Sequence, residues 1–224
     1  MISIIIPVLN EEAHLGSCIE AVRQNDASCE IIIVDGGSFD RTIEIAESFQ
    51  GVKVMKTPKG RGLQMNAGAF SATGDILLFL HADTTLEDGW VQAIARAVKD
   101  RSIAGGAFTF AINNPSKKYR VVEEWVRLRC FLFRLPYGDQ GIFVKRDVFH
   151  KLGGYKNIPL MEDVDLIERM KGQGRIVILD TKALTSERRW GRKGLIYTAL
   201  LNQLIMFLYK IGVHPQKLAR LYYR

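Results

Sequence analysis

The first half of the chain alternates short runs of β-branched residues with stretches whose apolar residues recur at helical spacing. The apolar runs predict strands at residues 3–8, 31–34, 52–55 and 76–80. The stretches between them predict helices at residues 11–23, 40–49 and 62–72. This order is typical of βαβ units, which build a largely parallel sheet with both faces covered. We therefore predict an α/β fold with a mixed, mainly parallel sheet flanked by helices.

The second half continues the alternation and then changes character. Helices are predicted at residues 90–98 and 116–134 and from Asp147 and Glu162, with strands from Gly105 and at residues 142–145 and 176–179. From Gly194 the sequence is very apolar but is interrupted by Asn202 and Gln203. We therefore divide the chain into a globular domain, residues 1–185, and a helical tail, residues 186–224, that is not an independent domain.

Polar residues gather where three of the predicted strands end. They lie at residues 7–11, 35–40 and 81–85. In open α/β sheets, ligands bind in the crevice outside the carboxyl ends of the strands. We therefore expect these three segments, far apart in the sequence, to meet at one binding site.

The formal net charge of +7 raises nucleic acid or an anionic membrane as partners. Residues 1–181 hold 22 basic and 23 acidic residues, whereas residues 182–224 hold 9 basic residues and one acidic residue. The positive excess therefore belongs to the tail. No recognition helix or stacking platform is discernible in the sequence, so we do not expect nucleic acid as a partner.

Two features indicate the compartment. The three cysteines, at positions 18, 29 and 130, form no C-x-x-C pair and no even framework, so neither a zinc site nor a disulfide scaffold is indicated. The N-terminus lacks a basic region before its apolar run and turns polar at Asn10, which indicates a first strand rather than a signal peptide. We predict a cytoplasmic protein.

The common phosphate-binding signatures are absent from the sequence. There is no G-x-x-x-x-G-K-[ST], and no G-x-G-x-x-G follows either of the first two predicted strands. Carboxylates and amides at strand ends instead suit a nucleotide whose diphosphate charge is balanced by Mg²⁺ or Mn²⁺, which needs only one or two protein carboxylates. Asp83 is the best metal candidate because it follows the most hydrophobic strand.

Several segments resemble, in order, the signatures of glycosyltransferase family 2, whose members are inverting enzymes with a GT-A fold. These are residues 3–12, 33–40, 80–83, 138–141 and 161–163, and the resemblance spans about residues 2–190. A closer resemblance, to bacterial members encoded beside radical-SAM or selenoprotein-domain proteins, is carried by residues 59–68, 79–84, 153–155 and 186–190.

The resemblance implies roles for matching positions. Nucleotide contacts are expected from Pro7, Asn10, Glu11, Asp35, Arg61, Asn66 and Ala82. Asp83 would bind the metal, and His81 stands where many members have the first aspartate of a D-x-D motif. An imidazole there can ligate Mn²⁺ or donate a hydrogen bond to a phosphate.

The catalytic carboxylates are expected at the start of the helix that opens at Glu162. By the resemblance, Asp163 would be the general base that deprotonates the acceptor hydroxyl, with Glu162 beside it. Contacts to the acceptor or the diphosphate are expected from Asp139, Gln140, Arg188, Arg189 and Trp190.

Each segment also has a plainer structural interpretation. Residues 35–38 are typical of a turn that leads into a capped helix, and residues 84–87 are typical of a helix start. Glu162 and Asp163 favour the positive end of a helix dipole. Residues 188–190 are compatible with a solvated basic surface and one tryptophan in the core.

The sequence therefore predicts a metal-dependent, inverting glycosyltransferase that moves a sugar from a UDP- or GDP-sugar to a hydroxyl acceptor. The alternatives are a sugar nucleotidyltransferase and a non-catalytic nucleotide-sugar-binding protein at the membrane surface. The basic, apolar tail has three interpretations: it lies on the inner face of an anionic membrane, packs on the domain, or contacts a second copy in a homodimer.

Overall fold

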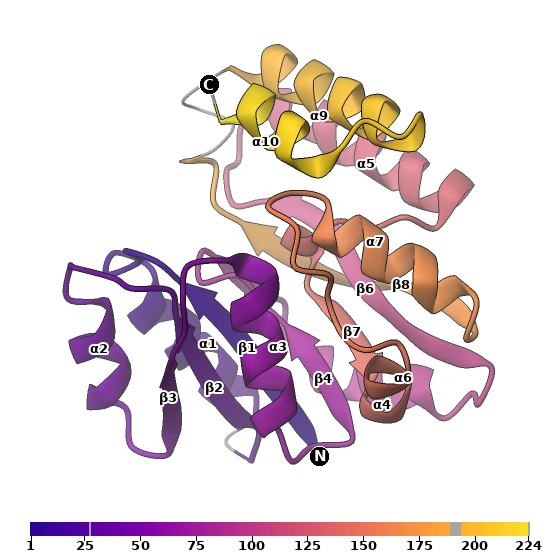
Figure 1. The fold of residues 1–224 in the computed structure, drawn as a ribbon. Helices are drawn as coiled ribbons and strands as arrows, with labels where there is room; N and C mark the ends of the chain where they lie inside the picture. Colours follow the sequence, from indigo (N-terminus) through magenta and orange to yellow (C-terminus); the bar gives the residue numbers. More distant parts are fainter. Residues whose placement is uncertain (27, 189–193, 224) are drawn as a thin grey trace.

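The computed structural model describes residues 1–26, 28–188 and 194–223 of the chain (Figure 1). In these residues one eight-stranded sheet runs in the order β3-β2-β1-β4-β7-β6-β8-β5. Its strands are β1 (Ile2–Val8), β2 (Glu30–Asp35), β3 (Val52–Lys56), β4 (Ile76–Phe79), β5 (Thr84–Leu86), β6 (Ile103–Ile112), β7 (Ile142–Lys145) and β8 (Arg175–Thr185).

The sheet is mixed. Strands β3, β2, β1 and β4 are all parallel, as is the pair of β6 and β8. Strand β7 joins these two parts because it pairs antiparallel with both β4 and β6, and β5 pairs antiparallel with β8. The predicted α/β fold with a mixed, mainly parallel sheet is confirmed.

One face of the sheet is covered by α1 (Leu15–Asn25), α2 (Thr42–Ser48) and α4 (Trp90–Val98). Successive side chains of a strand point to opposite faces. Accordingly, Ile4 and Ile6 of β1 belong to the core beneath these helices, and Ile5 belongs to the core on the other face. Both faces are thus buried, which explains why the first strands are almost wholly apolar.

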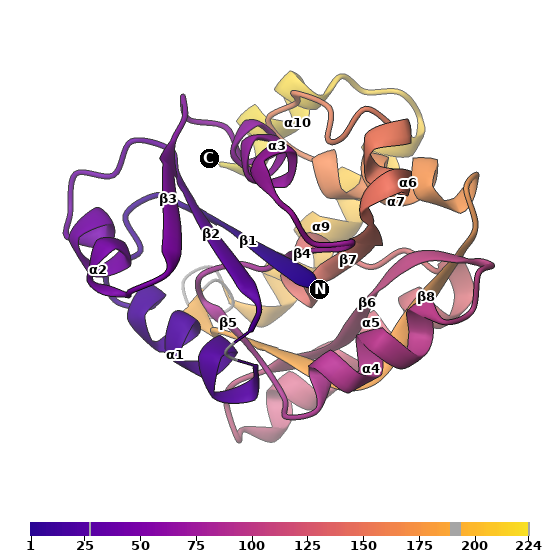
Figure 2. The ribbon, with the colours of Figure 1, turned by 90° about the horizontal axis from the view of Figure 1, so that it is seen from below.

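The other face is covered by α3 (Arg61–Ser71), α6 (Arg146–Lys151) and α7 (Glu162–Lys171) (Figure 2). Helix α3 packs closely on the sheet through Gly68, where a Cβ atom would lie 2.5 Å from Ile5 Cγ2. A larger residue there would push the helix away from β1. This close packing holds the start of α3, with Arg61, near the carboxyl ends of the strands.

Three further helices gather at one end of the molecule (Figure 1). Helix α5 (Lys117–Phe133) packs on β6, and the tail forms α9 (Leu195–Lys210) and α10 (Pro215–Tyr222). Ile205, Met206, Leu218 and Ala219 of the tail are buried in the same core as α3 and α7. The tail therefore packs on the domain. No helix within the described ranges is long and apolar enough to cross a bilayer.

Two segments differ from the predicted elements. Thr84–Leu86, interpreted from the sequence as a helix start, is strand β5, and β8 extends beyond the predicted residue 179 to Thr185. The reason is tertiary, because β5 pairs with the extended part of β8 about 100 residues later in the chain. Pairing over that distance leaves no local pattern in the sequence.

Candidate active site

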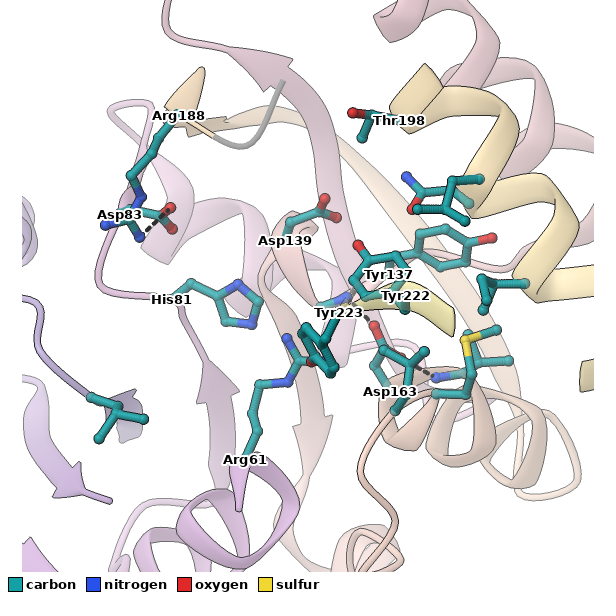
Figure 3. Close-up of a pocket in the computed structure, with 18 of the residues that line it drawn as sticks. Arg61, His81, Asp83, Tyr137, Asp139, Asp163, Arg188, Thr198, Tyr222 and Tyr223 are labelled. Carbon is teal, nitrogen blue, oxygen red and sulfur yellow. Dashed lines mark hydrogen bonds and ion pairs between the residues drawn. The ribbon is translucent and has the colours of Figure 1, made fainter. Parts of the chain in front are cut away.

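A cavity of about 520 Å³ opens where β1 and β4 end (Figure 3). Its walls come from the loops after these strands, the starts of α3 and α7, the 3₁₀ turn η1 (Gly138–Gln140), and α9 and α10. The predicted site residues that line it are Asn10, Glu11, Arg61, His81, Asp83, Asp139, Asp163 and Arg188. The structure thus brings together residues from distant parts of the sequence, as expected for strand ends.

The loop after β1 is held against the loop after β2. Asn10 has a left-handed backbone with φ of 56°; its N–H donates to Ser38 Oγ at 2.9 Å, and its side-chain oxygen accepts the Phe39 N–H at 3.0 Å. The Glu11 N–H donates to Thr42 Oγ1 at 2.8 Å. A positive φ at a residue other than glycine persists only where its surroundings enforce it. These hydrogen bonds therefore fix one wall of the cavity.

Asp35 lies just behind this wall. It is 2% exposed and does not line the cavity. Its carboxylate accepts the backbone N–H groups of Gly37 at 2.9 Å and Ser38 at 3.0 Å, which is the turn that the sequence offered as the plainer interpretation. Its contact to a nucleotide base stays a prediction.

Gln64 is a residue of this region that sequence reasoning missed. Its side chain is buried in α3, and its Nε2 donates to the carbonyl oxygens of Val8 and Val34, both at 2.8 Å. Val8 is the last residue of β1, and Val34 is the last but one of the neighbouring strand β2. One amide thus satisfies both strand ends below the site. A buried glutamine on an otherwise apolar helical face was the available signal.

Asp83 and Arg188 lie together at one end of the cavity (Figure 3). Glu11 joins them there, because its carboxylate contacts Arg188. Arg188 Nη2 lies 3.0 and 3.2 Å from the two Glu11 carboxylate oxygens and 3.6 Å from Asp83 Oδ2. The hydrogen bond to Glu11 and the charge of Asp83 raise the pKa of Arg188. A guanidinium in the wall can grip a diphosphate through two hydrogen bonds.

The residues at this end of the cavity show what kind of metal site the protein could form. The described residues contain no group of three or more His, Cys, Asp or Glu side chains that could hold an ion. Asp83 places one carboxylate in the cavity. Because Mg²⁺ or Mn²⁺ at a nucleotide site takes one or two carboxylates and completes its shell with phosphates and water, this donor set fits a cation shared with a ligand. It does not fit a site built by the protein alone.

His81 and Asp163 converge on Gly138. A Cβ atom on Gly138 would lie 3.2 Å from His81 Nε2 and 3.3 Å from Asp163 Oδ2. Asp163 Oδ2 accepts the Gly138 N–H at 2.7 Å, and its Oδ1 accepts the Val164 N–H at 2.8 Å. Both oxygens are thereby oriented. The carboxylate stands fixed on the cavity wall at the first turn of α7.

The imidazole of His81 is surrounded by charges of both signs. Burial and the positive charge of Arg61 lower its pKa, and Asp83, Asp139 and Asp163 oppose them without reversing the shift. The lowered pKa favours the neutral form of the ring. A neutral imidazole keeps both functions predicted for it, a hydrogen bond to phosphate or ligation of a metal.

Arg61 reaches the cavity from α3 and forms an ion pair with Glu162. Its Nε donates to Glu162 Oε1, and the charges of Glu162 and Asp163 outweigh burial and raise the pKa of Arg61. Glu162 is 1% exposed and does not line the cavity, and among the described residues its Oε2 has no hydrogen-bond partner. The structure thus places Glu162 behind Arg61, as its support, and not at the reacting centre where the sequence had suggested it.

Two predicted contacts belong to the framework. The side chain of Asn66 donates to the Tyr155 carbonyl at 2.9 Å and accepts the Tyr155 N–H at 2.8 Å. Gln140 is 1% exposed; its amide donates to the Phe108 carbonyl at 3.0 Å and accepts the Tyr137 N–H at 3.1 Å. Neither lines the cavity, because these bonds turn both amides into the protein.

The remaining predicted residues fall outside the cavity or outside the described structure. Pro7 lies within β1, opposite Val34 of β2, and Ala82 is buried in the core. Neither lines the cavity. The structure does not describe Arg189 and Trp190, so their expected contacts to acceptor or diphosphate stay predictions.

The tail lines the cavity, which the sequence did not indicate. Four residues of α9 and two near the end of α10 take part, namely Thr198, Leu201, Asn202, Ile205, Tyr222 and Tyr223. The four on α9 are spaced i, i+3, i+4 and i+7, so they share one helical face. That spacing was visible in the sequence and predicts a common face, but it does not say which surface the face meets.

A charged cavity at the carboxyl ends of parallel strands lies where ligands bind in open α/β sheets. The sequence profile of the family "Glycosyl transferase family 2" matches residues 3–155. The chain belongs to this family, and the resemblance drawn from its motifs is confirmed.

One relative is the PGL/p-HBAD biosynthesis glycosyltransferase of Mycobacterium bovis (strain BCG / Pasteur 1173P2). The two are 34% identical over 166 residues, which is 69% of this chain and 63% of the relative. The chain therefore spans less than two thirds of the length of this curated relative.

Two solved structures share the fold. The mannosyltransferase PcManGT from Pyrobaculum calidifontis, in complex with GDP-Man and Mn²⁺, matches 99% of this chain and 68% of its own, with a TM-score of 0.67 and 16% identity. S. aureus TarS 1-349 in complex with UDP matches 83% of this chain and 60% of its own, with a TM-score of 0.65 and 16% identity. These likenesses confirm the GT-A fold.

Proposed function

We propose that this chain transfers a sugar from a nucleoside diphosphate sugar to an acceptor hydroxyl, with inversion at the anomeric carbon. The observation that carries the proposal is the Asp163 carboxylate, fixed on the cavity wall by the Gly138 N–H at 2.7 Å. Two guanidinium groups, from Arg61 and Arg188, line the same cavity. A positioned base beside anion-binding groups is the equipment that this reaction needs.

The donor would occupy the charged part of the cavity. Arg61 and Arg188 would meet its diphosphate, and Asn10 and Glu11 would meet its nucleoside, with Asp35 behind them. Uridine or guanosine is the proposed base. The solved relatives support this choice, since one is in complex with UDP and another with GDP-Man.

In the proposed reaction, Asp163 takes the proton of the acceptor hydroxyl while that oxygen attacks the anomeric carbon. The bond from this carbon to the diphosphate oxygen breaks, and its electron pair leaves with the diphosphate. A single displacement of this kind inverts the anomeric centre. General base catalysis of this type contributes about 10²–10⁴-fold to the rate.

A divalent cation is the proposed cofactor. Asp83 would hold Mn²⁺ or Mg²⁺ together with the donor diphosphate, and His81 is the nearest further candidate by sequence and by its place in the cavity. When bound, the cation would neutralise charge that develops on the departing diphosphate. The Mn²⁺ in the mannosyltransferase complex supports this assignment.

A thermal-shift panel tests the donor site. UDP, GDP and their sugars are added with and without Mn²⁺ to the wild type, to Asp83→Ala, and to Asp88→Ala as a control on an exposed carboxylate of the next loop. We expect one nucleoside diphosphate to raise the Tm of the wild type and of Asp88→Ala in a Mn²⁺-dependent manner. In Asp83→Ala the Mn²⁺ dependence should disappear. Stabilisation by no nucleoside diphosphate would contradict the proposal.

Two additions to the panel, a nucleoside triphosphate and the variant Asp163→Asn, separate the two alternative functions. A sugar nucleotidyltransferase would bind a nucleoside triphosphate and a sugar phosphate, and it normally carries a glycine-rich basic loop directly after the first strand. Residues 7–12 occupy that place here and contain neither glycine nor a basic residue. A non-catalytic binding protein would keep its whole function without the base, which the Asp163 variant tests.

A further inference from the structure

The cavity has two chemically different parts. The part between the strand ends carries the charged groups, whereas the part beneath the tail is apolar and aromatic (Figure 3). The apolar part is lined by Leu160, Val164, Leu201, Ile205, Tyr222 and Tyr223. The donor assignment uses only the charged part, so the apolar part is left for another ligand.

Helix α9 presents different residues to its two sides. Leu201 and Ile205 face the cavity, while their neighbours Leu200 and Leu204 are 65% and 46% exposed. Thr198 also faces the cavity, and its hydroxyl donates to the Gly194 carbonyl at 2.8 Å. On the inner face of α9, Leu201 and Ile205 therefore offer hydrocarbon to a ligand, and Thr198 and Asn202 add one hydroxyl and one amide to the same face.

Asp163 and Tyr137 stand where the two parts meet. Asp163 is the proposed base, and Val164, the next residue, already belongs to the apolar wall. The guanidinium carbon of Arg129 lies 3.5 Å from the centroid of the Tyr137 ring, which fixes the ring in the wall. In the described part of the chain the buried Tyr137 hydroxyl has no hydrogen-bond partner. A ligand hydroxyl that approaches Asp163 would therefore lie where the charged and the apolar parts of the cavity meet.

We propose that the acceptor carries its reacting hydroxyl on an apolar body, an alkyl chain or an aromatic ring, which lies against α9 and α10. The inference rests on the proposed function and names the substrate class of the same site. A free sugar would lose water from several hydroxyls against a wall of hydrocarbon, whereas an apolar body gains from leaving water. The tail is then a specificity-determining wall of the active site.

Saturation-transfer NMR with three probes tests the acceptor class. The probes are 1-octanol, 4-octylphenol and methyl glucoside, each below its self-association limit and in the absence of vesicles. The variants are Leu201→Asn, which places an amide in the apolar wall, and Leu200→Asn, the matched control on the opposite face. Their Tm values and nucleotide-induced shifts are measured in the same samples.

We expect both apolar alcohols to bind the wild type and methyl glucoside not to bind. The affinity of the alcohols should fall about tenfold in Leu201→Asn and stay unchanged in Leu200→Asn. A preference for octanol or for octylphenol distinguishes an alkyl from an aryl acceptor. Binding of methyl glucoside alone, or equal effects of the two variants, would overturn the inference while leaving nucleotide binding intact. Failure of the proposed function would instead appear as the absence of any nucleotide-induced shift.

The outer surface carries a second, independent observation. On α5, Val121, Trp125, Leu128 and Leu132 are spaced i, i+4, i+7 and i+11 and are 50–70% exposed. On the outer face of α9, Tyr197, Leu200, Leu204, Phe207 and Ile211 are also exposed. We call these two stripes the outer apolar face.

The two helices that carry these stripes are neighbours. Helices α5 and α9 lie side by side (Figure 1), and the Lys210 ammonium nitrogen on α9 lies 5.3 Å from the centroid of the Phe133 ring on α5. Large contiguous apolar patches are uncommon on soluble proteins and mark interaction sites. The same two helices also carry basic residues, namely Lys117, Lys118 and Arg127 on α5, Arg134 at its end, and Lys210 on α9; of these, Arg127 is ion-paired with Glu124.

From this combination we infer that the outer apolar face lies on an anionic lipid bilayer. Apolar and aromatic side chains would enter the region between headgroups and acyl chains, and the basic residues would meet anionic headgroups. This assigns membrane contact to α5 as well as to the tail.

Co-sedimentation with vesicles tests the outer apolar face. The double variant Trp125→Ser/Phe207→Ser removes one aromatic ring from each stripe, and Phe39→Ser removes an even more exposed ring elsewhere. We expect the wild type and Phe39→Ser to bind phosphatidylcholine vesicles that contain phosphatidylglycerol, and the double variant to bind at least about tenfold more weakly.

Light scattering on the same samples identifies a competing occupant. A wild-type dimer that the double variant converts to a monomer, without vesicle binding by either, would overturn the membrane assignment in favour of a second copy. Equal binding to vesicles that lack phosphatidylglycerol would overturn the role given to the basic residues.

Discussion

Asp163 Oδ2 accepts the backbone N–H of Gly138 at 2.7 Å, across 25 residues of the chain. The bond joins the first turn of α7 to η1, and it orients the carboxylate toward the junction between the charged and the apolar parts of the cavity (Figure 3). Its partner is a backbone group, so mutation of a neighbouring side chain does not remove it. The carboxylate of the proposed base is therefore positioned before any substrate binds.

We expect Asp163→Asn to lower turnover about 10²–10⁴-fold with the donor affinity kept. The asparagine oxygen can still accept the Gly138 N–H, so the side chain keeps this anchor and loses only the one to Val164, while the proposed base is removed. The measurement is nucleoside diphosphate release in the presence of acceptor, together with the donor-induced thermal shift. The matched control is Glu168→Gln, an exposed carboxylate later in α7. Unchanged turnover in Asp163→Asn would favour a non-catalytic binding protein.

Gly138→Ala should lower turnover with little change in Tm. Its Cβ would lie 3.2 Å from His81 Nε2 and 3.3 Å from Asp163 Oδ2, so both side chains must shift by a few tenths of an ångström. Displacements of this size lower the catalytic rate strongly but change the free energy of unfolding little. Gly172→Ala is the control, since Gly172 has φ of −74° and its Cβ would approach nothing closer than 3.4 Å. Equal turnover in both variants would show that the spacing at Gly138 is not critical.

The sequence predicted best those site residues that directly follow a strand or lie at the start of a helix. Asp83 and His81 follow β4 and Asp163 opens α7, and all three line the cavity. It failed where a side chain has a partner far along the chain. The Arg61–Glu162 ion pair spans 101 residues, and no local pattern distinguishes a carboxylate that faces a ligand from one that holds an arginine. The inner face of α9 was missed for the same reason, because helical spacing defines a face but not its neighbour.

The Arg61–Glu162 pair leads to a prediction about stability. Arg61→Met leaves the carboxylate of Glu162, 1% exposed, without its positive partner, and we expect a loss of about 2–3 kcal/mol in the free energy of unfolding. We take less than the full cost of breaking a buried pair because the Arg61 side chain is 36% exposed. The double variant Arg61→Met/Glu162→Gln should recover most of the loss. Urea denaturation measures the free energy of unfolding of Arg61→Met, Glu162→Gln and the double variant. If the losses of the two single variants add in the double variant, the coupling is contradicted.

Glu30 lies at the end of the sheet away from the cavity, and it makes the stability of the fold sensitive to acid. Burial opposes its ionisation, but hydrogen bonds from Lys53, Ser3 and the Thr73 N–H outweigh it and lower its pKa from 4.5 to about 2. Because the pKa of Glu30 is lower in the folded than in the unfolded state, its carboxylate stabilises the fold at pH values above the unfolded pKa. This contribution disappears as the pH falls from about 4.5 to about 2. Glu30→Gln should therefore be less stable than the wild type at pH 7, by about 1–2 kcal/mol after allowance for solvent screening, and the difference should vanish near pH 2.

Urea denaturation as a function of pH measures this difference in the free energy of unfolding, with Glu20→Gln on the exposed side of α1 as the control. A difference that persists unchanged at pH 2 would mean that Glu30 stabilises the sheet by packing and not by charge.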